Sequence, residues 1–331
     1  MQNSKFTINN SKVLVTGGAG FIGSNIVEKL LEQNNYVVCL DNFATGKHEN
    51  ISKFVKDKNF KLIDDDIRDL TACQNACKEI DIILHHAALG SVPRSINDPI
   101  SSNEVNVNGF LNMLVAARDN KVKRFVYASS SSVYGDNIAS PKIEDKIGNA
   151  LSPYAVTKQV NEMYAKVFSD LYGLETIGLR YFNVFGKNQD PESVYAAVFP
   201  KFIKSLIHLQ APTIHGDGSQ SRDFTYIANV IQANELAATT NNPKAINTIY
   251  NVAYGETNNL NDITNLLIQL LAKFKPEIAN IKPIHGPERK GDIKDSLASI
   301  EKAKSLLNYN PKFDVRQGLE LTVKWYYENL K

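Results

Sequence analysis

Short apolar runs alternate with amphipathic stretches through about the first 180 residues of the chain. The run Lys12–Thr16 (KVLVT) is typical of a buried strand, and residues 21–33 repeat apolar side chains at helical spacing. Residues 155–171 predict a long amphipathic helix in the same way. Five further strands are predicted at 36–40, 61–63, 81–84, 124–128 and 175–179. Because strands that alternate with helices form βαβ units, we predict an α/β fold with a doubly wound parallel (Rossmann) sheet and helices on both faces.

The pattern becomes less regular after Asn183. Helices are predicted at 196–209, 229–239, 260–273 and 319–328, one strand at Thr248–Val252, and loops at 212–218 and 284–291. We expect a Rossmann domain over residues 1–183, with a polar tail at 1–10, and a smaller mixed lobe over residues 184–331, part of which crosses back to the first domain. Ligand sites on such sheets lie at the carboxyl ends of the strands, where the second lobe would cover them.

Composition narrows the class of protein. The 331 residues are 43% hydrophobic, and 37 Lys and Arg against 35 Asp and Glu leave a net charge of +2. Proteins that bind nucleic acids or membrane surfaces carry a larger and more clustered basic excess. No apolar run approaches the roughly 18 residues that span a bilayer, and the polar N-terminus lacks the apolar stretch of a signal peptide. We therefore expect a cytoplasmic protein.

Cysteine and histidine usage predicts neither a disulfide framework nor a metal site. Cys39, Cys73 and Cys77 are odd in number and few, so we expect reduced thiols. Cys73 and Cys77 lie four residues apart on a predicted helix, but no other ligand is near them in the sequence. Four histidines show no ligand spacing and are interpreted as core or surface residues: His85, His86, His208 and His215.

A glycine-rich segment follows the first predicted strand and opens the first helix. Gly17 and Gly20 permit a tight turn and close backbone approach to a pyrophosphate, and Gly23 lets the helix pack against the strand. The residues between them, Phe21 and Ile22, begin the helix whose free N–H groups would face the anion. A structural turn alone is the alternative interpretation.

Asp41 ends the second predicted strand, eighteen residues after Gly23, and Asn42 follows it. A carboxylate in this place hydrogen-bonds ribose hydroxyls and repels a 2′-phosphate, so it favours NAD over NADP.

Tyr154 and Lys158 lie four apart at the start of a predicted helix, so both face the same side. A neighbouring ammonium and a positively charged nicotinamide favour the phenolate, which would make Tyr154 a general base. A serine run ends a strand about twenty residues upstream, and its hydroxyls can bind a sugar oxygen and share its proton with the tyrosine. Ser130 is the first candidate and Ser132 the second.

These motifs together resemble the extended short-chain dehydrogenase/reductase family, whose glycine spacing is Gly-x-x-Gly-x-x-Gly. The resemblance implies that Asp66 and Ile67 meet the adenine, and that Ala87 and Ala88 line the cofactor. In Leu179–Gly186 (LRYFNVFG), it implies that the backbone at Phe182 lies along the nicotinamide and that Asn183 contacts a sugar diphosphate. Within the serine motif, it maps the catalytic hydroxyl onto Ser130.

Two arginines in polar loops, Arg222 and Arg289, suit a diphosphate, because each guanidinium can form two parallel hydrogen bonds. Surface ion pairs are the alternative. Asp292, three residues after Arg289, is assigned to the same site. Family dehydratases and decarboxylases carry a Glu in the segment that reads Ser130–Ser131–Ser132 here, so the resemblance disfavours those reactions.

The segment ALGSVPRSINDP (88–99), the serine run and the segment SRDF (221–224) narrow the resemblance to bacterial UDP-N-acetylglucosamine 4-epimerases of surface-polysaccharide synthesis. It implies that Ser91 and Arg94 face the sugar and that Ser296 lies beside its C2 substituent. A serine there leaves room for an N-acetyl group that the phenol of a tyrosine would fill.

We therefore expect an isomerase that converts UDP-GlcNAc to UDP-GalNAc with tightly bound NAD, and that works as a homodimer. Tyr154 would remove the 4-hydroxyl proton while the C4 hydride passes to NAD, and return of the hydride to the opposite face would invert C4. Three alternatives stay open: a UDP-glucuronate 4-epimerase, another NAD-dependent nucleotide-sugar oxidoreductase, and a non-catalytic NAD-binding protein.

Overall fold

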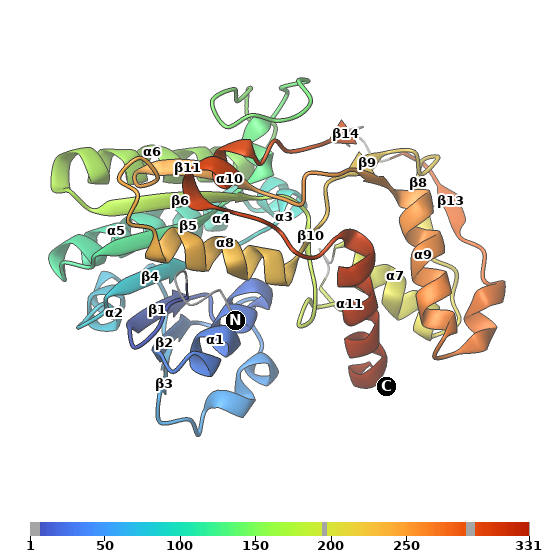
Figure 1. The fold of residues 1–331 in the computed structure, drawn as a ribbon, viewed down its shortest axis with the longest axis horizontal. Coiled ribbons are helices and arrows are strands. Elements are labelled where there is room, and N and C mark those ends of the chain that lie inside the picture. Colours follow the sequence, from blue (N-terminus) through green and yellow to red (C-terminus); the bar gives the residue numbers. More distant parts are fainter. Residues whose placement is uncertain (1–6, 194–196, 289–294, 331) are drawn as a thin grey trace.

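The computed structural model describes residues 7–193, 197–288 and 295–330. Its centre is a parallel sheet of seven strands in the order β11-β6-β5-β4-β1-β2-β3 (Figure 1). The strands are β1 (Lys12–Thr16), β2 (Tyr36–Asp41), β3 (Phe60–Asp64), β4 (Ile82–His85), β5 (Arg124–Ser130), β6 (Glu175–Tyr181) and β11 (Thr248–Val252). The α/β fold class with a Rossmann sheet is therefore confirmed.

Alternating side chains of the strands supply two separate cores, one on each face of the sheet. In β1, Val13 and Val15 join one core and Leu14 joins the other, as the two-residue repeat of a strand requires. The first core packs under α1 (Phe21–Glu32), α8 (Ile227–Thr239) and α10 (Glu301–Leu307). The second packs under α2 (Leu70–Ala76), α5 (Phe110–Asp119) and α6 (Pro153–Tyr172).

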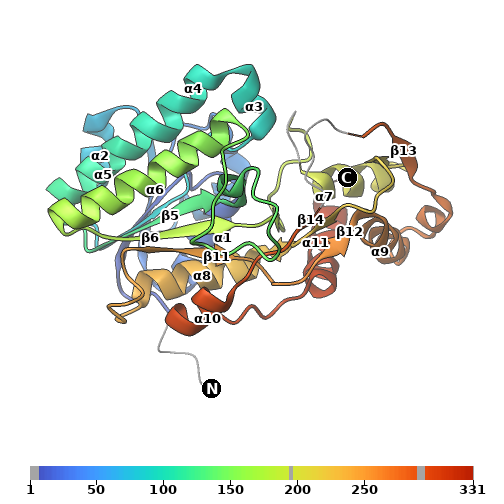
Figure 2. The ribbon, with the colours of Figure 1, turned by 90° about the horizontal axis from the view of Figure 1, so that it is seen from above.

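A smaller lobe lies beside the sheet and has its own apolar core (Figure 2). Its helices are α7 (Val198–Ile207), α9 (Leu260–Ala272) and α11 (Val315–Asn329). Short strands form three further sheets: β7 (Val184–Phe185) with β10 (Thr225–Tyr226), β8 (Thr213–His215) with β13 (Ile284–Gly286), and β9 (Ser221–Arg222) with β12 (Asn258–Asn259) and β14 (Asp295–Ser296).

The chain after residue 183 belongs to both halves of the molecule. It adds β11 to the edge of the main sheet beside β6, and α8 and α10 to one face of that sheet. The chain therefore passes between the sheet and the lobe several times.

Several elements differ from the sequence prediction. Segments 212–218 and 284–291 were expected to be loops, yet each contributes three residues to the β8–β13 pair. Three residues are too few for an alternating pattern, and the pairing partner is distant in sequence. The terminal helix begins at Val315 and not at residue 319, because Asp314 and Gln317 form a capping box.

Several helical segments have no predicted counterpart, among them α3 (Val92–Asn97), α4 (Pro99–Asn103), the π-helical turn Glu104–Gly109 and α5, which follows it. Helix α3 and the following segment lie beside α6 and bring the chain after β4 to the site. Within the described ranges, no helix is both long and apolar enough to cross a bilayer.

Candidate active site

The glycine-rich loop lies directly against the end of β4. Gly17 adopts φ +68°, and a side-chain Cβ there would come within 2.7 Å of the Ala87 nitrogen. At Gly23, a Cβ would lie 2.1 Å from the Gly17 carbonyl oxygen, so only glycine lets α1 start this close to the turn. In both places the backbone fills the space that a side chain would need, so the glycines let the loop pack tightly against β4 and α1. The N-terminus of α1 borders a cavity and could receive a phosphate group, which fits a dinucleotide cofactor.

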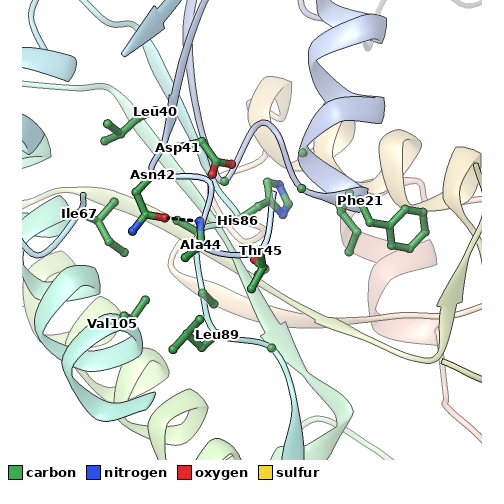
Figure 3. Close-up of a pocket in the computed structure, with 18 of the residues that line it drawn as sticks. Phe21, Leu40, Asp41, Asn42, Ala44, Thr45, Ile67, His86, Leu89 and Val105 are labelled. Carbon is green, nitrogen blue, oxygen red and sulfur yellow. Dashed lines mark hydrogen bonds between the residues drawn. The ribbon is translucent and has the colours of Figure 1, made fainter. Parts of the chain in front are cut away.

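Asp41 holds the loops on either side of the ribose position. Its Oδ2 accepts a hydrogen bond from the Ala19 nitrogen at 2.8 Å, and its Oδ1 accepts one from the Phe43 nitrogen at 2.8 Å. Burial raises the pKa of Asp41 above its ordinary value, while these two N–H donors lower it. Figure 3 shows Asp41 beside Asn42, whose Oδ1 accepts from the Ala44 nitrogen at 3.1 Å. The carboxylate thus orders the loop that would surround the ribose.

Asp66 and Ile67, like Asp41 and Asn42, line a cavity at the carboxyl ends of the strands. Asp66 accepts from Asn42 Nδ2 at 2.7 Å and forms an ion pair with Arg68 at 2.7 Å, and the Arg68 hydrogen bond lowers the pKa of Asp66. Ile67 is buried in the core. In Figure 3 its side chain lies on the same side of the cavity as Asn42.

One cavity runs along the carboxyl ends of the strands and collects most of the residues expected to bind the cofactor. The expected residues that line it are Gly17, Gly20, Phe21, Ile22, Gly23, Asp41, Asn42, Asp66, Ile67, Ala87, Ala88, Ser130, Tyr154 and Lys158. Phe182 does not line it, because its side chain is fully buried in the core beside Tyr134.

Other lining residues were not singled out from the sequence: Leu40, Ala44, Thr45, Asp65, His86, Leu89, Gly90, Val105, Ala128, Ser129 and Tyr181. His86 was interpreted as a core or surface residue, yet it borders this cavity and its ring stacks on Tyr181 with 6.0 Å between centroids. Burial and the charge of Lys158 lower its pKa to about 3, so the imidazole is neutral. Its position directly after β4 was the available signal. Leu89 and Val105 carry no such signal.

Helix α6 presents Tyr154 and Lys158 in its first two turns. Ser152 caps the helix by accepting from the Ala155 nitrogen at 3.1 Å, and Pro153 occupies the first helical position. The Tyr154 nitrogen donates to Ser95 Oγ at 3.0 Å, which ties α6 to α3. These local contacts fix where the phenol enters the cavity.

The protein's own groups do not ionise Tyr154. Burial raises the pKa of Tyr154 above its ordinary value, and hydrogen bonding to Ser130 lowers it only in part. Lys158 Nζ donates to the Ala128 carbonyl oxygen at 2.8 Å and lies 5.9 Å from the centre of the Tyr154 ring. Burial also lowers the pKa of Lys158 to about 8. Among the described residues, none fully offsets the effect of burial on the phenol, and the positive charge of a bound oxidised nicotinamide would favour the phenolate.

Two serine hydroxyls lie together at the end of β5. Ser132 donates to Ser130 Oγ from its own Oγ at 3.0 Å and from its nitrogen at 3.2 Å. The Ser130 oxygen thus accepts two hydrogen bonds, which orients its own proton away from Ser132. Ser130 lines the cavity, whereas Ser132 lies behind it.

A buried ion pair supports this strand end. Glu162, one turn after Lys158, accepts from Ser129 Oγ at 2.5 Å and from Arg180 at 2.8 and 2.9 Å. Arg180 also donates to Tyr134 Oη at 3.0 Å. Helix α6 and strands β5 and β6 are thereby fixed relative to one another next to Ser130.

Three of the residues expected to bind substrate lie together between the sheet and the lobe. Ser296 on β14 is in register with Arg222 on β9, and Asn183 Nδ2 donates to the Asp223 carbonyl oxygen at 2.9 Å. Asn183 and Arg222 also line a second cavity in the lobe. Its other lining residues include Pro93, Phe199, Phe202, Thr213, Gln220 and Phe224.

Ser91 and Arg94 lie at the start of α3, and neither lines the first or the second cavity. Ser91 caps α3, and its Oγ accepts from the Arg94 nitrogen at 3.1 Å. Pro93, between them, lines the second cavity. Arg289 and Asp292 lie outside the described residues. Within the described ranges, no three His, Cys, Asp or Glu side chains come together as a possible metal site.

A sequence model of the NAD dependent epimerase/dehydratase family matches residues 13–253. The chain belongs to this family. Its cofactor is NAD, and it is an enzyme of the UDP-sugar 4-epimerase group.

Three similar solved structures contain a bound UDP-sugar. The UDP-N-acetylglucosamine 4-epimerase of Methanobrevibacter ruminantium, in complex with UDP-N-acetylmuramic acid, is 38% identical with a TM-score of 0.89, covering 97% of this chain and 99% of that one. The Thermotoga maritima UDP-glucose 4-epimerase with UDP-glucose is 33% identical (TM-score 0.88; 97% and 100% covered). The Bacillus cereus UDP-glucuronic acid 4-epimerase with its substrate and NAD is 31% identical (TM-score 0.86; 97% and 100% covered).

Proposed function

We propose that this enzyme interconverts UDP-GlcNAc and UDP-GalNAc by inverting C4 of the sugar. The observation that carries the proposal is that Ser130, Tyr154 and Lys158 line the same cavity as the glycine-rich loop and Asp41. The similarity to a UDP-N-acetylglucosamine 4-epimerase supports the choice of sugar.

Different side chains of the protein transfer the proton and hold the sugar oxygen. Bound NAD supplies a reversible acceptor for the C4 hydride. Tyr154 takes the proton of the 4-hydroxyl group as the C4–H bond breaks, and Ser130 holds the 4-oxygen. Lys158 places a positive charge near the Tyr154 phenolate that accepts this proton. When the 4-keto sugar has turned its other face to the cofactor, Tyr154 returns the proton and C4 is inverted, with no net oxidation.

The second cavity suits the nucleotide half of the substrate. Phe199, Phe202 and Phe224 give it apolar walls against which a base can pack, and Arg222 lies at its edge as a partner for the diphosphate. Asn183 lines the same cavity. A sugar attached to a diphosphate held here would extend toward Ser296 and the catalytic cavity.

The first experiment incubates the purified enzyme with UDP-GlcNAc, UDP-glucose and UDP-glucuronate in turn, without added NAD. We expect UDP-GalNAc to form from UDP-GlcNAc with the largest kcat/KM and with no net reduction of NAD. A larger kcat/KM for UDP-glucuronate would replace this proposal by the uronate epimerase. Stoichiometric NADH formation would indicate a dehydrogenase.

The variant Ser296→Tyr tests the N-acetyl preference. If Ser296 faces the C2 substituent, the phenol should overlap the N-acetyl group and leave the hydroxyl of UDP-glucose tolerated. We expect the ratio of kcat/KM for UDP-GlcNAc to that for UDP-glucose to fall more than about tenfold, or roughly 1.4 kcal/mol of differential transition-state binding. Ser299→Tyr, three residues further along, is the matched control. An unchanged ratio in an active Ser296→Tyr enzyme would place Ser296 away from the sugar.

We also propose that the enzyme is a homodimer joined through α6. Four exposed apolar side chains of this helix, Val156, Met163, Val167 and Leu171, fall on one face at spacings of seven, four and four. Ile100 of the adjacent α4 is exposed as well. A two-fold axis would bring the same stripe of a second copy against this one, because a self-complementary patch is what a two-fold interface requires.

A further inference from the structure

Four crossings of the chain between the sheet and the lobe converge on one residue. They follow β6 (182–184), connect β9 to β10 (222–225), follow β11 (253–255) and follow β14 (296–299). Figures 1 and 2 show the sheet and the lobe side by side with these segments between them. Asp223 lies in the second crossing and makes hydrogen bonds to each of the other three.

The side chain of Asp223 binds two of the crossings. Its Oδ1 accepts from the nitrogens of Tyr254 at 3.1 Å and Gly255 at 3.3 Å, in the segment that leaves β11. Its Oδ2 accepts from the Gly255 nitrogen at 3.1 Å and from the Ala298 nitrogen at 3.3 Å, in the segment that leaves β14. One carboxylate therefore joins two backbone segments that are about forty residues apart in sequence.

The backbone of Asp223 binds the substrate side of the site. Its nitrogen donates to the Ser296 carbonyl oxygen at 2.8 Å, and its carbonyl oxygen accepts from Asn183 Nδ2 at 2.9 Å. Arg222 is the preceding residue. The three described residues that we assign to the lobe side of the sugar diphosphate are thus each bonded to, or adjacent to, Asp223.

Asp223 is fully buried, and no Lys or Arg side chain of the described residues forms an ion pair with it. Burial raises its pKa to about 7, the N–H groups of Ala298, Tyr254 and Gly255 lower it, and Glu256 raises it further. Burial and the charge of Asp223 raise the pKa of the nearby Tyr309 phenol, and this phenol carries no positive charge that could offset the carboxylate. Burying a carboxylate is unfavourable unless hydrogen bonds offset the loss of water. The side-chain hydrogen bonds of Asp223 all go to the backbone of the crossings.

We infer that Asp223 is a positioning residue for substrate binding, which fixes Asn183, Arg222 and Ser296 of the lobe side relative to the catalytic serine and tyrosine of the sheet. It does not touch the reacting atoms. Its contribution is to the affinity for the nucleotide sugar and not to the binding of NAD, whose cavity it does not line. The inference rests on the proposed function for the identity of the sugar.

The variant Asp223→Asn tests this role with little change in volume. The amide keeps one acceptor oxygen but directs an NH₂ group toward backbone N–H donors, so one of the two side-chain connections is lost. We expect KM for the nucleotide sugar and Kd for UDP to rise at least about tenfold, while kcat falls less than about threefold and bound NAD per chain is unchanged. Hydrogen exchange at Tyr254, Gly255 and Ala298 should accelerate, with the amides of β1 and β4 unaffected.

The matched control is Tyr309→Phe, which removes a buried hydrogen bond to the Ala253 carbonyl oxygen in the same region but no bond to the substrate residues. We expect its KM and Kd to stay within twofold of the wild type. A folded Asp223→Asn enzyme with KM and Kd within twofold would overturn the inference, as would loss of NAD and of cooperative unfolding together. If the wild type binds UDP but converts no sugar, the proposed function fails, while the two Kd values for UDP still decide the role of Asp223.

Discussion

The residue scale shows why a Tyr-x-x-x-Lys motif is only part of a general base. From the sequence, Lys158 was expected to favour the phenolate of Tyr154, yet its ammonium is bonded to the Ala128 carbonyl oxygen and lies above the ring and not at the hydroxyl. Burial raises the pKa of the phenol. Because a nearby positive charge favours the phenolate, a bound oxidised nicotinamide would be expected to make Tyr154 more acidic.

Replacing Tyr154 with Phe should lower kcat by at least about two orders of magnitude. The only α6 side chains that line the cavity in the described structure are Tyr154 and Lys158, so the variant has no second phenol beside the lysine to act as the base. Binding of the UDP-sugar, measured by calorimetry, should remain within about threefold. Tyr250→Phe, which removes a buried phenol bonded to Ala245 far from the cavity, is the control. Turnover of Tyr154→Phe within tenfold of the wild type would mean that another group is the base.

At the scale of elements, the sequence predicted the parts of the chain whose periodicity is long. The seven strands of the sheet and helices α1 and α6 lie within a few residues of their expected positions. β5 and β6 each extend two residues further than expected. The added residues, Ser129 and Ser130 in β5 and Arg180 and Tyr181 in β6, lie at the site. Polar residues at a strand end interrupt the apolar pattern, so the predicted strand ends before the residues that border the site.

The glycine loop, Asp41, Ser130, Tyr154 and Lys158 could be placed from local motifs, and all border one cavity. His86 and Asp223 could not be assigned. Whether His86 borders the cavity depends on which way its side chain points at the end of β4. The role of Asp223 depends on backbone segments up to 75 residues away in sequence. Spacing along a sequence carries no information on such contacts.

If the proposed dimer forms through α6, this helix serves both the proposed active site and the interface, because one of its faces holds Tyr154 and another carries the apolar stripe. The double variant Met163→Glu, Val167→Glu places two charges in that stripe. We expect light scattering to show a monomer where the wild type is a dimer, with NAD still bound, since buried charge without a partner is unfavourable at an interface. Val55→Glu changes an exposed apolar residue elsewhere and should leave the dimer intact. A wild-type chain that is monomeric at micromolar concentration would contradict the dimer outright.

On the scale of the whole molecule, two apolar cores belong to the sheet and a third to the lobe, and the site lies where the chain passes between them. The buried carboxylate at this junction makes stability depend on pH. Asp223 has a pKa of about 7 in the folded protein, against an ordinary value of 3.8. Between these values the folded state binds more protons than the unfolded chain, so the free energy of unfolding falls as pH rises.

We expect the stability of the wild type relative to Asp223→Asn to fall between pH 4 and pH 7, by up to about 4 kcal/mol. The difference should be constant below this window and again above it, because the amide does not titrate and the other groups cancel. Urea unfolding of both proteins at each pH measures the difference. A difference that stays flat would show that the pKa of Asp223 is the same in the folded and unfolded states, and one that grows with pH would show that the N–H donors outweigh burial.

The three cysteines have a practical consequence for following this molecule at work. Cys39, Cys73 and Cys77 are all buried, and burial raises each thiol pKa to about 12. Because thiol reagents attack the thiolate, maleimide dyes should leave the native chain unlabelled at pH 7. Two cysteines introduced on exposed positions, one on the sheet side and one on α9, would then be the sole attachment points for a fluorophore pair. Energy transfer between the dyes would report the separation of the lobe from the sheet in a single molecule during turnover, without prior removal of any natural cysteine.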